Sequence, residues 1–168
     1  WYGQGVFPWE RRAKGVNKLA NFKPELDWEP LRNEMKEHGV RNATLMAIAP
    51  VESSSVVINS TNGIELPMHL ISVKESKAGS LTQVVPDYHI KRVRNSYQLM
   101  WDQTDCADYL KTASVLAAYV DQSISTNTFY NPAHFVNNKI PTTLIAKNLM
   151  QAHQWGLKTF YYSLINKA

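Results

Sequence analysis

One carboxylate and three hydroxyls follow one another in segment 52–55. An apolar run at 43–49, closed by Pro50, precedes them, and the apolar residues 56–58 that follow could begin a helix. The free backbone N–H groups and the positive dipole end of a helix start can bind an anion, and serine suits that position. A strand, a serine-rich turn and a helix start form the usual phosphate site of α/β folds. The segment is therefore either a phosphate site or a well-capped helix that binds nothing.

Two adjacent tyrosines, Tyr161 and Tyr162, form the second unusual feature, inside a predicted strand at 157–165. Neighbouring side chains of a strand point to opposite faces, so such a pair is usually one core and one surface residue. The two phenols can act together only at a strand end or a turn, with their rings stacked. A phenol can lose a proton and an electron together, so a stacked pair could relay a radical.

The other reactive side chains form no recognisable arrangement. Cys106 is the single cysteine and cannot form an internal disulfide. Its predicted place at a helix start would lower its pKa, but the lack of a partner favours a packed thiol. The five histidines are scattered, and no Cys/His spacing is typical of zinc sites. The sequence predicts no metal site.

Composition indicates one globular domain with a sizeable core, since the 168 residues are 44% hydrophobic. No apolar run approaches the ~20 residues of a membrane span, and no signal segment opens the chain. With one cysteine, these features favour a cytoplasmic setting and no membrane contact. The chain begins at Trp1 within an aromatic, loop-like segment, which suggests that a longer protein is entered partway.

The net charge of +4 belongs to the N-terminal segment. Residues 1–24 hold five Lys or Arg and one acid, whereas the rest holds 13 of each sign. Nucleic-acid-binding proteins usually spread such an excess over a face with interleaved aromatics, so a nucleic-acid partner is not expected. Residues 1–26 are predicted to form an irregular basic arm that packs on an upstream segment, and residues 27–168 form the body.

The body is predicted to be α/β or α+β. Asp27 can cap a helix that Gly39 ends, Asp105 can cap a helix over 106–122, and Gly156 can end a helix that begins after Pro141. A further helix is expected at 90–101. Residues 70–76 and 81–85 read as a hairpin around 77–80. Strands are expected at 43–49 and 157–165.

Six blocks of this sequence resemble the large (α) subunit of class I ribonucleotide reductase. They are residues 41–44, 49–55, 62–65, 83–88, 121–125 with Asn127, and 156–162. Each block alone is modest, and their shared order and spacing make the resemblance specific. It implies the C-terminal portion of a ten-stranded α/β barrel, with the hairpin as an excursion.

The resemblance also implies site residues. A ribonucleoside diphosphate would bind at the turn, with its diphosphate held by backbone N–H groups and hydroxyls. The implied substrate-binding residues are Pro50, Val51, Glu52, Ser53 and Ser54. Tyr161 and Tyr162 would carry a radical from a small, metal-containing (β) subunit to a cysteine of the barrel. No cofactor would be bound by this segment, and a dithiol would be the reductant; the 121–127 stretch receives no role.

Some features depart from the family pattern. The radical cysteine, its neighbouring carboxylate and the reducing cysteine pair are expected in an upstream part of the α subunit, and Cys106 matches none of them. Ser53 stands where threonine is common, and residues 66–68 replace a Pro-Pro-Arg run. The chain would be an excised piece or half of a split subunit. The alternatives are an inactive reductase remnant, or a phosphate- or nucleic-acid-binding accessory module.

Overall fold

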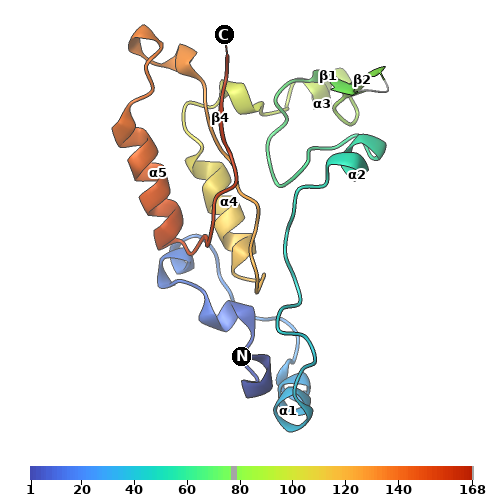
Figure 1. Ribbon diagram of the computed structural model, residues 1–168, viewed down its shortest axis with the longest axis vertical. Coiled ribbons are helices and arrows are strands. Elements are labelled where there is room, and N and C mark those ends of the chain that lie inside the picture. Colours follow the sequence, from blue (N-terminus) through green and yellow to red (C-terminus); the bar gives the residue numbers. More distant parts are fainter. Residues whose placement is uncertain (77–78, 168) are drawn as a thin grey trace.

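A computed structural model describes residues 1–76 and 79–167. The helices are α1 (Glu29–His38), α2 (Glu52–Val57), α3 (Lys91–Arg94), α4 (Ala107–Ala117) and α5 (Thr142–Gln154). The strands are β1 (Ile71–Ser76), β2 (Gly79–Val84), β3 (Thr128–Tyr130) and β4 (Ser163–Ile165). Short 3-10 helices lie at Tyr2–Gln4, Pro8–Arg11, Lys14–Lys18, Met100–Asp102, Pro132–His134 and Val136–Asn138. Figure 1 shows an elongated molecule in which α4, α5 and β4 lie together and α2 and the hairpin lie apart from them.

The centre of the fold is a β-α-β unit. Strands β3 and β4 pair in parallel, with Phe129 opposite Leu164, and α5 lies between them in the chain. A parallel pair needs such a crossover connection, which is the hallmark of α/β architecture. The α/β class is confirmed, although the described residues form two two-stranded sheets rather than a closed barrel. Strand β3 was not predicted, because its three residues precede the Asn131-Pro132 break.

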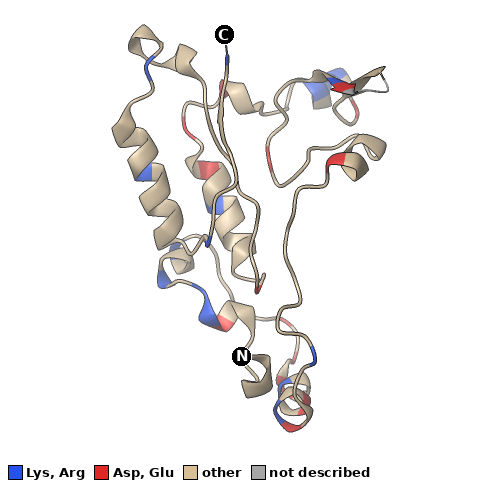
Figure 2. Ribbon diagram, in the orientation of Figure 1, with Lys and Arg blue, Asp and Glu red and all other residues tan. Residues whose placement is uncertain are grey.

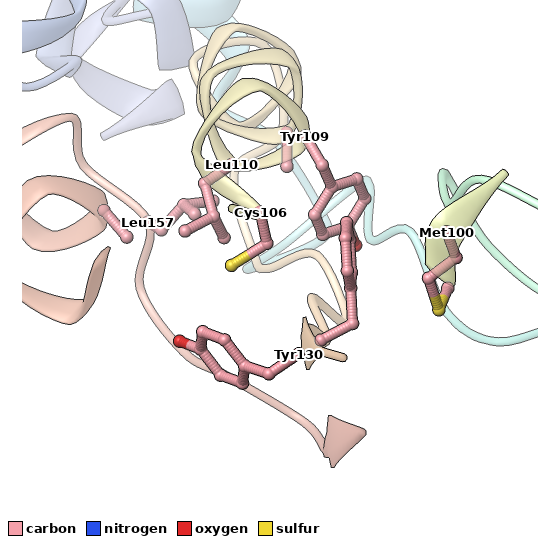
Figure 3. Close-up of a cluster of buried hydrophobic side chains, with 9 residues drawn as sticks. Met100, Cys106, Tyr109, Leu110, Tyr130 and Leu157 are labelled. Carbon is pink, nitrogen blue, oxygen red and sulfur yellow. The ribbon is translucent and has the colours of Figure 1, made fainter. Parts of the chain in front are cut away.

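The main core lies between this unit and α4. Phe129, Leu110 and Met100 are at most 2% exposed, and residues of α5 and Leu157 close the cluster. Figure 3 shows the Cys106 sulfur among these side chains, near Leu110 and Tyr130. Burial of such large apolar side chains contributes about 1.5–3 kcal/mol each. This core holds the start of β3 in place. It therefore also positions residues 161–162, which contact the start of β3 and precede β4.

Cys106 is a packed thiol, as favoured from the sequence. It is fully buried at the N-cap of α4, and the Asn148 side-chain amide donates to its sulfur at 3.3 Å. Burial raises the pKa of the Cys106 thiol, more than the hydrogen bonds from the backbone and Tyr130 lower it. The expected lowering by the helix start is therefore wrong, because desolvation disfavours the thiolate.

The N-terminal arm is more ordered than predicted. It contains three 3-10 helices, and its aromatic residues pack on other parts of this chain. Phe7 stacks on Trp9 at 4.6 Å between ring centroids, next to Met35 of α1, while Phe22 packs near α4. Of the basic residues of the arm, Arg11, Lys14 and Lys18 lie in the 3-10 helices, where Figure 2 shows blue segments. The division at residue 26 stays a prediction.

The two predicted capping aspartates lie one residue before the N-caps of α1 and α4, which are Trp28 and Cys106, but both accept from the first turn, and Gly156 ends α5 as predicted. Asp27 accepts from the Glu29 N–H at 3.0 Å, Asp105 accepts from the Ala107 N–H at 2.9 Å, and Gly156 follows α5 with φ of +90°. The hairpin is also confirmed, with Val73 opposite Thr82. Part of its predicted turn, residues 77–78, lies outside the described residues.

The predicted helix over 90–101 is wrong for most of its length. Only the four residues of α3 are α-helical, and a 3-10 helix appears at Met100–Asp102. The Tyr97 hydroxyl donates to the Pro86 carbonyl at 2.9 Å, so its side chain does not join a helix stripe. The contact of Tyr97 with Pro86, 11 positions earlier, draws this segment away from a regular helix.

The predicted buried strand at 43–49 is also wrong. Leu45 and Met46 are 52% and 55% exposed, and the run is reduced to one parallel bridge between Ile48 and Ile124. Among the described residues, the run pairs through one edge only, which leaves its side chains open. The extended backbone is held by the Asp121 carboxylate, which accepts from the Leu45 and Met46 N–H groups at 2.6 and 2.7 Å.

Asp121 joins several distant segments. Partial burial would raise the pKa of its carboxyl, but the N–H donors of Met46 and Leu45 and the Tyr2 hydroxyl hold that pKa below its usual value. Lys158 donates to the carbonyl groups of residues 120–122. The first half of the 121–127 stretch therefore has a structural role: it anchors the extended 45–48 run to the end of α4.

Candidate functional site

The predicted helix start at 56–58 is wrong, because that stretch ends the short helix α2 (Glu52–Val57), with Ile58 as its C-cap. The N-cap of α2 is Val51, so the three serines lie inside the helix, and the expected serine cap is wrong. The Ser55 N–H donates to the Val51 carbonyl at 2.8 Å, which closes the first turn. A helix leaves its first N–H groups without intrahelical acceptors, and in α2 these belong to Glu52, Ser53 and Ser54.

The outer surface of this turn is accessible. Val51, Glu52, Ser53 and Ser54 are all exposed, as is Pro50 before them. The Val51 N–H is already used, because it donates to the Asn62 carbonyl at 2.8 Å. An anion at this turn would therefore meet three backbone donors and two hydroxyls, with Val51 serving as a fixed support.

The inner side of α2 is tied to the loop after it. Ser55 is fully buried, and its hydroxyl lies 2.7 Å from the Glu52 carbonyl and 2.8 Å from the Asn62 side-chain oxygen. One hydroxyl has one proton to donate, so the two acceptors share it. These contacts hold the open turn against the Asn62-Gly63 loop.

The hairpin contacts α2 on its inner side, where Ser55 lies. The Gln83 side-chain amide donates to the carbonyls of Ser55 and Val56 at 3.4 and 3.3 Å. The Lys74 ammonium approaches the Ser55 hydroxyl and the Asn62 side-chain oxygen, both at 3.4 Å. Next to these contacts, the hairpin and the 59–69 loop enclose a cavity of about 590 Å³. A cation behind α2 adds to the positive end of its dipole.

Tyr161 and Tyr162 lie just before β4, which is shorter than the predicted strand at 157–165. Because the pair precedes the strand, strict alternation does not separate the rings. The ring centroids are 4.0 Å apart and the ring planes meet at 49°, a close but tilted arrangement rather than a face-to-face stack. Both side chains are about half exposed, at 51% and 56%.

The two phenols influence each other. A hydrogen bond with Tyr162 is the main cause that raises the pKa of Tyr161, and the negative charge of Glu52 adds to it. Both effects favour the neutral phenol at physiological pH.

Backbone and side-chain hydrogen bonds fix the tyrosine pair to the segment before β3. The Tyr161 N–H donates to the Thr126 carbonyl at 2.8 Å, and the Tyr162 carbonyl accepts from the Thr128 N–H at 2.9 Å. Between them, the Tyr162 N–H donates to the side-chain oxygen of Asn127 at 3.0 Å. Asn127 was present in a resemblance block but received no role from the sequence, because its contact with Tyr162 spans 35 positions.

Other classes of site find no support in the described part of the chain. Across residues 1–76 and 79–167, no group of three or more His, Cys, Asp or Glu could hold a metal ion. Within the same residues, no helix is both long and apolar enough to cross a membrane.

The comparisons with known proteins agree on one family. A family model described as ribonucleotide reductase, barrel domain, matches residues 2–163. The ribonucleoside-diphosphate reductase subunit alpha of Buchnera aphidicola subsp. Baizongia pistaciae is 48% identical over 161 residues. Subunit alpha of ribonucleoside-diphosphate reductase 1 from Escherichia coli K12 is 42% identical over 161 residues, and that of Enterobacteria phage T4 is 38% identical over 163.

These matches cover 96% of this chain but 21% of each of those relatives. The chain thus spans about a fifth of their length. The barrel-domain match confirms the expected α/β barrel class, and the match over nearly all residues confirms the resemblance drawn from the six blocks. By sequence match and fold, the chain belongs to the barrel-domain family of ribonucleotide reductases, among the α subunits.

Proposed function

We propose that this chain is the C-terminal part of the catalytic barrel of a ribonucleoside-diphosphate reductase α subunit. The complete enzyme reduces ribonucleoside diphosphates to deoxyribonucleoside diphosphates by radical chemistry. This segment contributes the turn that binds the substrate diphosphate and the tyrosine pair that transfers the radical. The observation that carries the proposal is the family match over residues 2–163, joined to the open turn of α2 and the paired phenols.

The diphosphate binds at the exposed start of α2. The N–H groups of Glu52, Ser53 and Ser54 donate to phosphate oxygens, and the two serine hydroxyls add further donors. Pro50 and Val51 set the entry of the chain into the turn. The Glu52 carboxylate favours the helix start, and its side chain turns away from the phosphate because like charges repel. The Lys74 ammonium behind the turn offsets part of the added negative charge.

The radical passes through Tyr161 and Tyr162. Each phenol gives up one electron and one proton to the preceding member of the path and regains both from the next. Two rings whose centroids lie 4.0 Å apart suit this exchange. The raised pKa of Tyr161 keeps its phenol protonated at neutral pH, so it does not act as an ordinary base.

The remaining parts of the reaction come from partners. The small (β) subunit generates the radical with its own metal cofactor, and an upstream part of the α subunit supplies the reactive cysteines. A dithiol restores these cysteines after each turnover. We place this assembly in the cytoplasm, without membrane contact. No observation favours a nucleic-acid-binding module or an inactive remnant over this role.

The isolated chain is expected to form no deoxyribonucleotide when mixed with the small subunit and a dithiol. Its one cysteine is buried with a raised pKa, and a two-electron reduction that ends in a disulfide needs two thiols. Adding the upstream part of the α subunit is expected to restore turnover. Product formation by the chain alone would contradict the assignment. A failure of the chain to bind the upstream part of the α subunit would contradict it as well.

A further inference from the structure

The side chain of Asn127 joins the two halves of the candidate site. Its amide NH₂ donates to the Glu65 carboxylate at 2.8 Å, and its amide oxygen accepts from the Tyr162 N–H at 3.0 Å. The three residues come from separate segments, since Glu65 lies 62 positions before Asn127 and Tyr162 lies 35 after it. No other residue of the 121–127 stretch bridges these segments through its side chain in the described structure.

The chemistry of the neighbours fixes the orientation of this amide. An ionised carboxylate only accepts hydrogen bonds, and a backbone N–H only donates. The NH₂ of Asn127 must therefore face Glu65, and its oxygen must face Tyr162. A flipped amide would place an oxygen against the carboxylate and an NH₂ against the N–H, losing both contacts. Glu65 thus determines where the acceptor for Tyr162 lies.

We propose that Asn127 and Glu65 are positioning residues for the tyrosine pair. The side-chain oxygen of Asn127 accepts from the Tyr162 N–H, as a carbonyl of a neighbouring strand would. It thereby holds the Tyr162 backbone immediately before β4, where the pairing of Thr128 with Ser163 begins. Glu65 orients the Asn127 amide, because its carboxylate accepts from the amide NH₂. The proposal deepens the proposed function, because it rests on Tyr161 and Tyr162 being the radical-transfer pair.

The exposure of the pair explains why such a support is needed. Both tyrosine side chains are about half exposed, so packing against the core does not determine the place of their rings. Radical exchange depends on the separation of the two rings, and here the backbone sets it. The Tyr162 backbone has two holders, the Thr128 N–H on its carbonyl and Asn127 on its N–H.

Glu65 also belongs to the loop that supports the phosphate turn. Asn62, three positions before it, accepts from the Val51 N–H and from the Ser55 hydroxyl. The loop 62–65 therefore touches α2 at one end and Asn127 at the other. The substrate turn and the tyrosine pair thus share the 62–65 loop as one of their supports.

Four variants in the reconstituted enzyme test this role. Asn127→Leu removes both hydrogen bonds, and Glu65→Leu removes the partner that orients the amide. Glu65→Gln keeps an acceptor for the Asn127 NH₂ and serves as the conservative rescue. Gln122→Glu is the matched control, because it changes the charge of an exposed side chain in the same stretch.

Asn127→Leu and Glu65→Leu are expected to lower kcat by about tenfold or more while KM for the ribonucleoside diphosphate stays within about twofold. Glu65→Gln and Gln122→Glu are expected to keep kcat within about twofold of the parent. The double Leu variant is expected to be no worse than Asn127→Leu alone, because the two residues act as a unit. A purely structural role would instead raise KM, lower the melting temperature or weaken small-subunit binding.

The result that overturns the inference is a folded Asn127→Leu enzyme with parental kcat. If that variant does not fold, Glu65→Leu with parental kcat, or Glu65→Gln as impaired as Glu65→Leu, overturns it equally. Tyr162→Phe in the same assay distinguishes a failure of the proposed radical transfer from a failure of the positioning role. Turnover by Tyr162→Phe contradicts the proposed function itself, whereas an inactive Tyr162→Phe beside an unaffected Asn127→Leu contradicts only the positioning role.

Discussion

Replacing Tyr162 by Phe is expected to abolish turnover of the reconstituted enzyme. Phenylalanine keeps the ring beside Tyr161 but lacks the O–H bond that releases the proton and the electron. Tyr162 is 56% exposed, so the loss of its hydroxyl leaves the fold almost unchanged. Tyr161→Phe is expected to have the same effect, since either change removes one of the two O–H bonds on the radical path. The measurement is the rate of deoxyribonucleotide formation with saturating substrate.

A second tyrosine gives the matched control for this experiment. Tyr119 is 44% exposed, and its ring packs near Trp9 and Phe22, far in the sequence from the pair. Tyr119→Phe is expected to keep parental turnover. Substrate affinity should be the same in all three variants. If Tyr161→Phe or Tyr162→Phe turns over near the parental rate, the two rings serve only in packing.

Replacing Ser55 by Leu is expected to weaken binding of the ribonucleoside diphosphate strongly. Ser55 is fully buried, and its hydroxyl holds α2 against Asn62. A larger apolar side chain cannot fit without moving the helix, and it leaves the Asn62 oxygen with only the distant Lys74 ammonium. The expected cost is about 1–3 kcal/mol, or about a 5- to 150-fold rise in Kd.

Equilibrium binding of the nucleotide to the assembled α subunit measures this effect. Ser80→Leu, the same change at an exposed position of β2, is the control and is expected to leave Kd unaltered. Ser55→Ala is a gentler variant for the case in which the Leu variant does not fold. A folded Ser55 variant that binds the nucleotide as the parent does would contradict the placement of the diphosphate at α2.

Local signals in the sequence predicted the elements that local chemistry determines. Asp27 and Asp105 each accept from the N–H group two residues later, at the starts of α1 and α4, and the end of α5 needs the positive φ of Gly156. The hairpin follows from two apolar-polar alternating runs beside a glycine. A helix next to the serine-rich segment was predicted, but its start was placed at 56–58, where α2 ends, and the serines proved to be interior residues rather than caps.

Contacts between distant residues decided what the sequence could not predict. The 43–49 run is held by Asp121 rather than by a sheet on both sides, and the 90–101 segment is diverted by the Tyr97 contact with Pro86. Tyr161 and Tyr162 precede β4, which begins later than predicted, so strand alternation does not apply to their rings. The bridging role of Asn127 needs Glu65 and Tyr162, which no local pattern brings together.

The most direct test of the central claim is the structure of the assembled α subunit with a ribonucleoside diphosphate bound. We expect phosphate oxygens within hydrogen-bond distance, about 2.7–3.2 Å, of the backbone nitrogens of Glu52, Ser53 and Ser54. We also expect Tyr161 and Tyr162 to lie between the substrate and the surface that binds the small subunit. A diphosphate bound at another part of the barrel, with the start of α2 making no contact to it, would contradict the account.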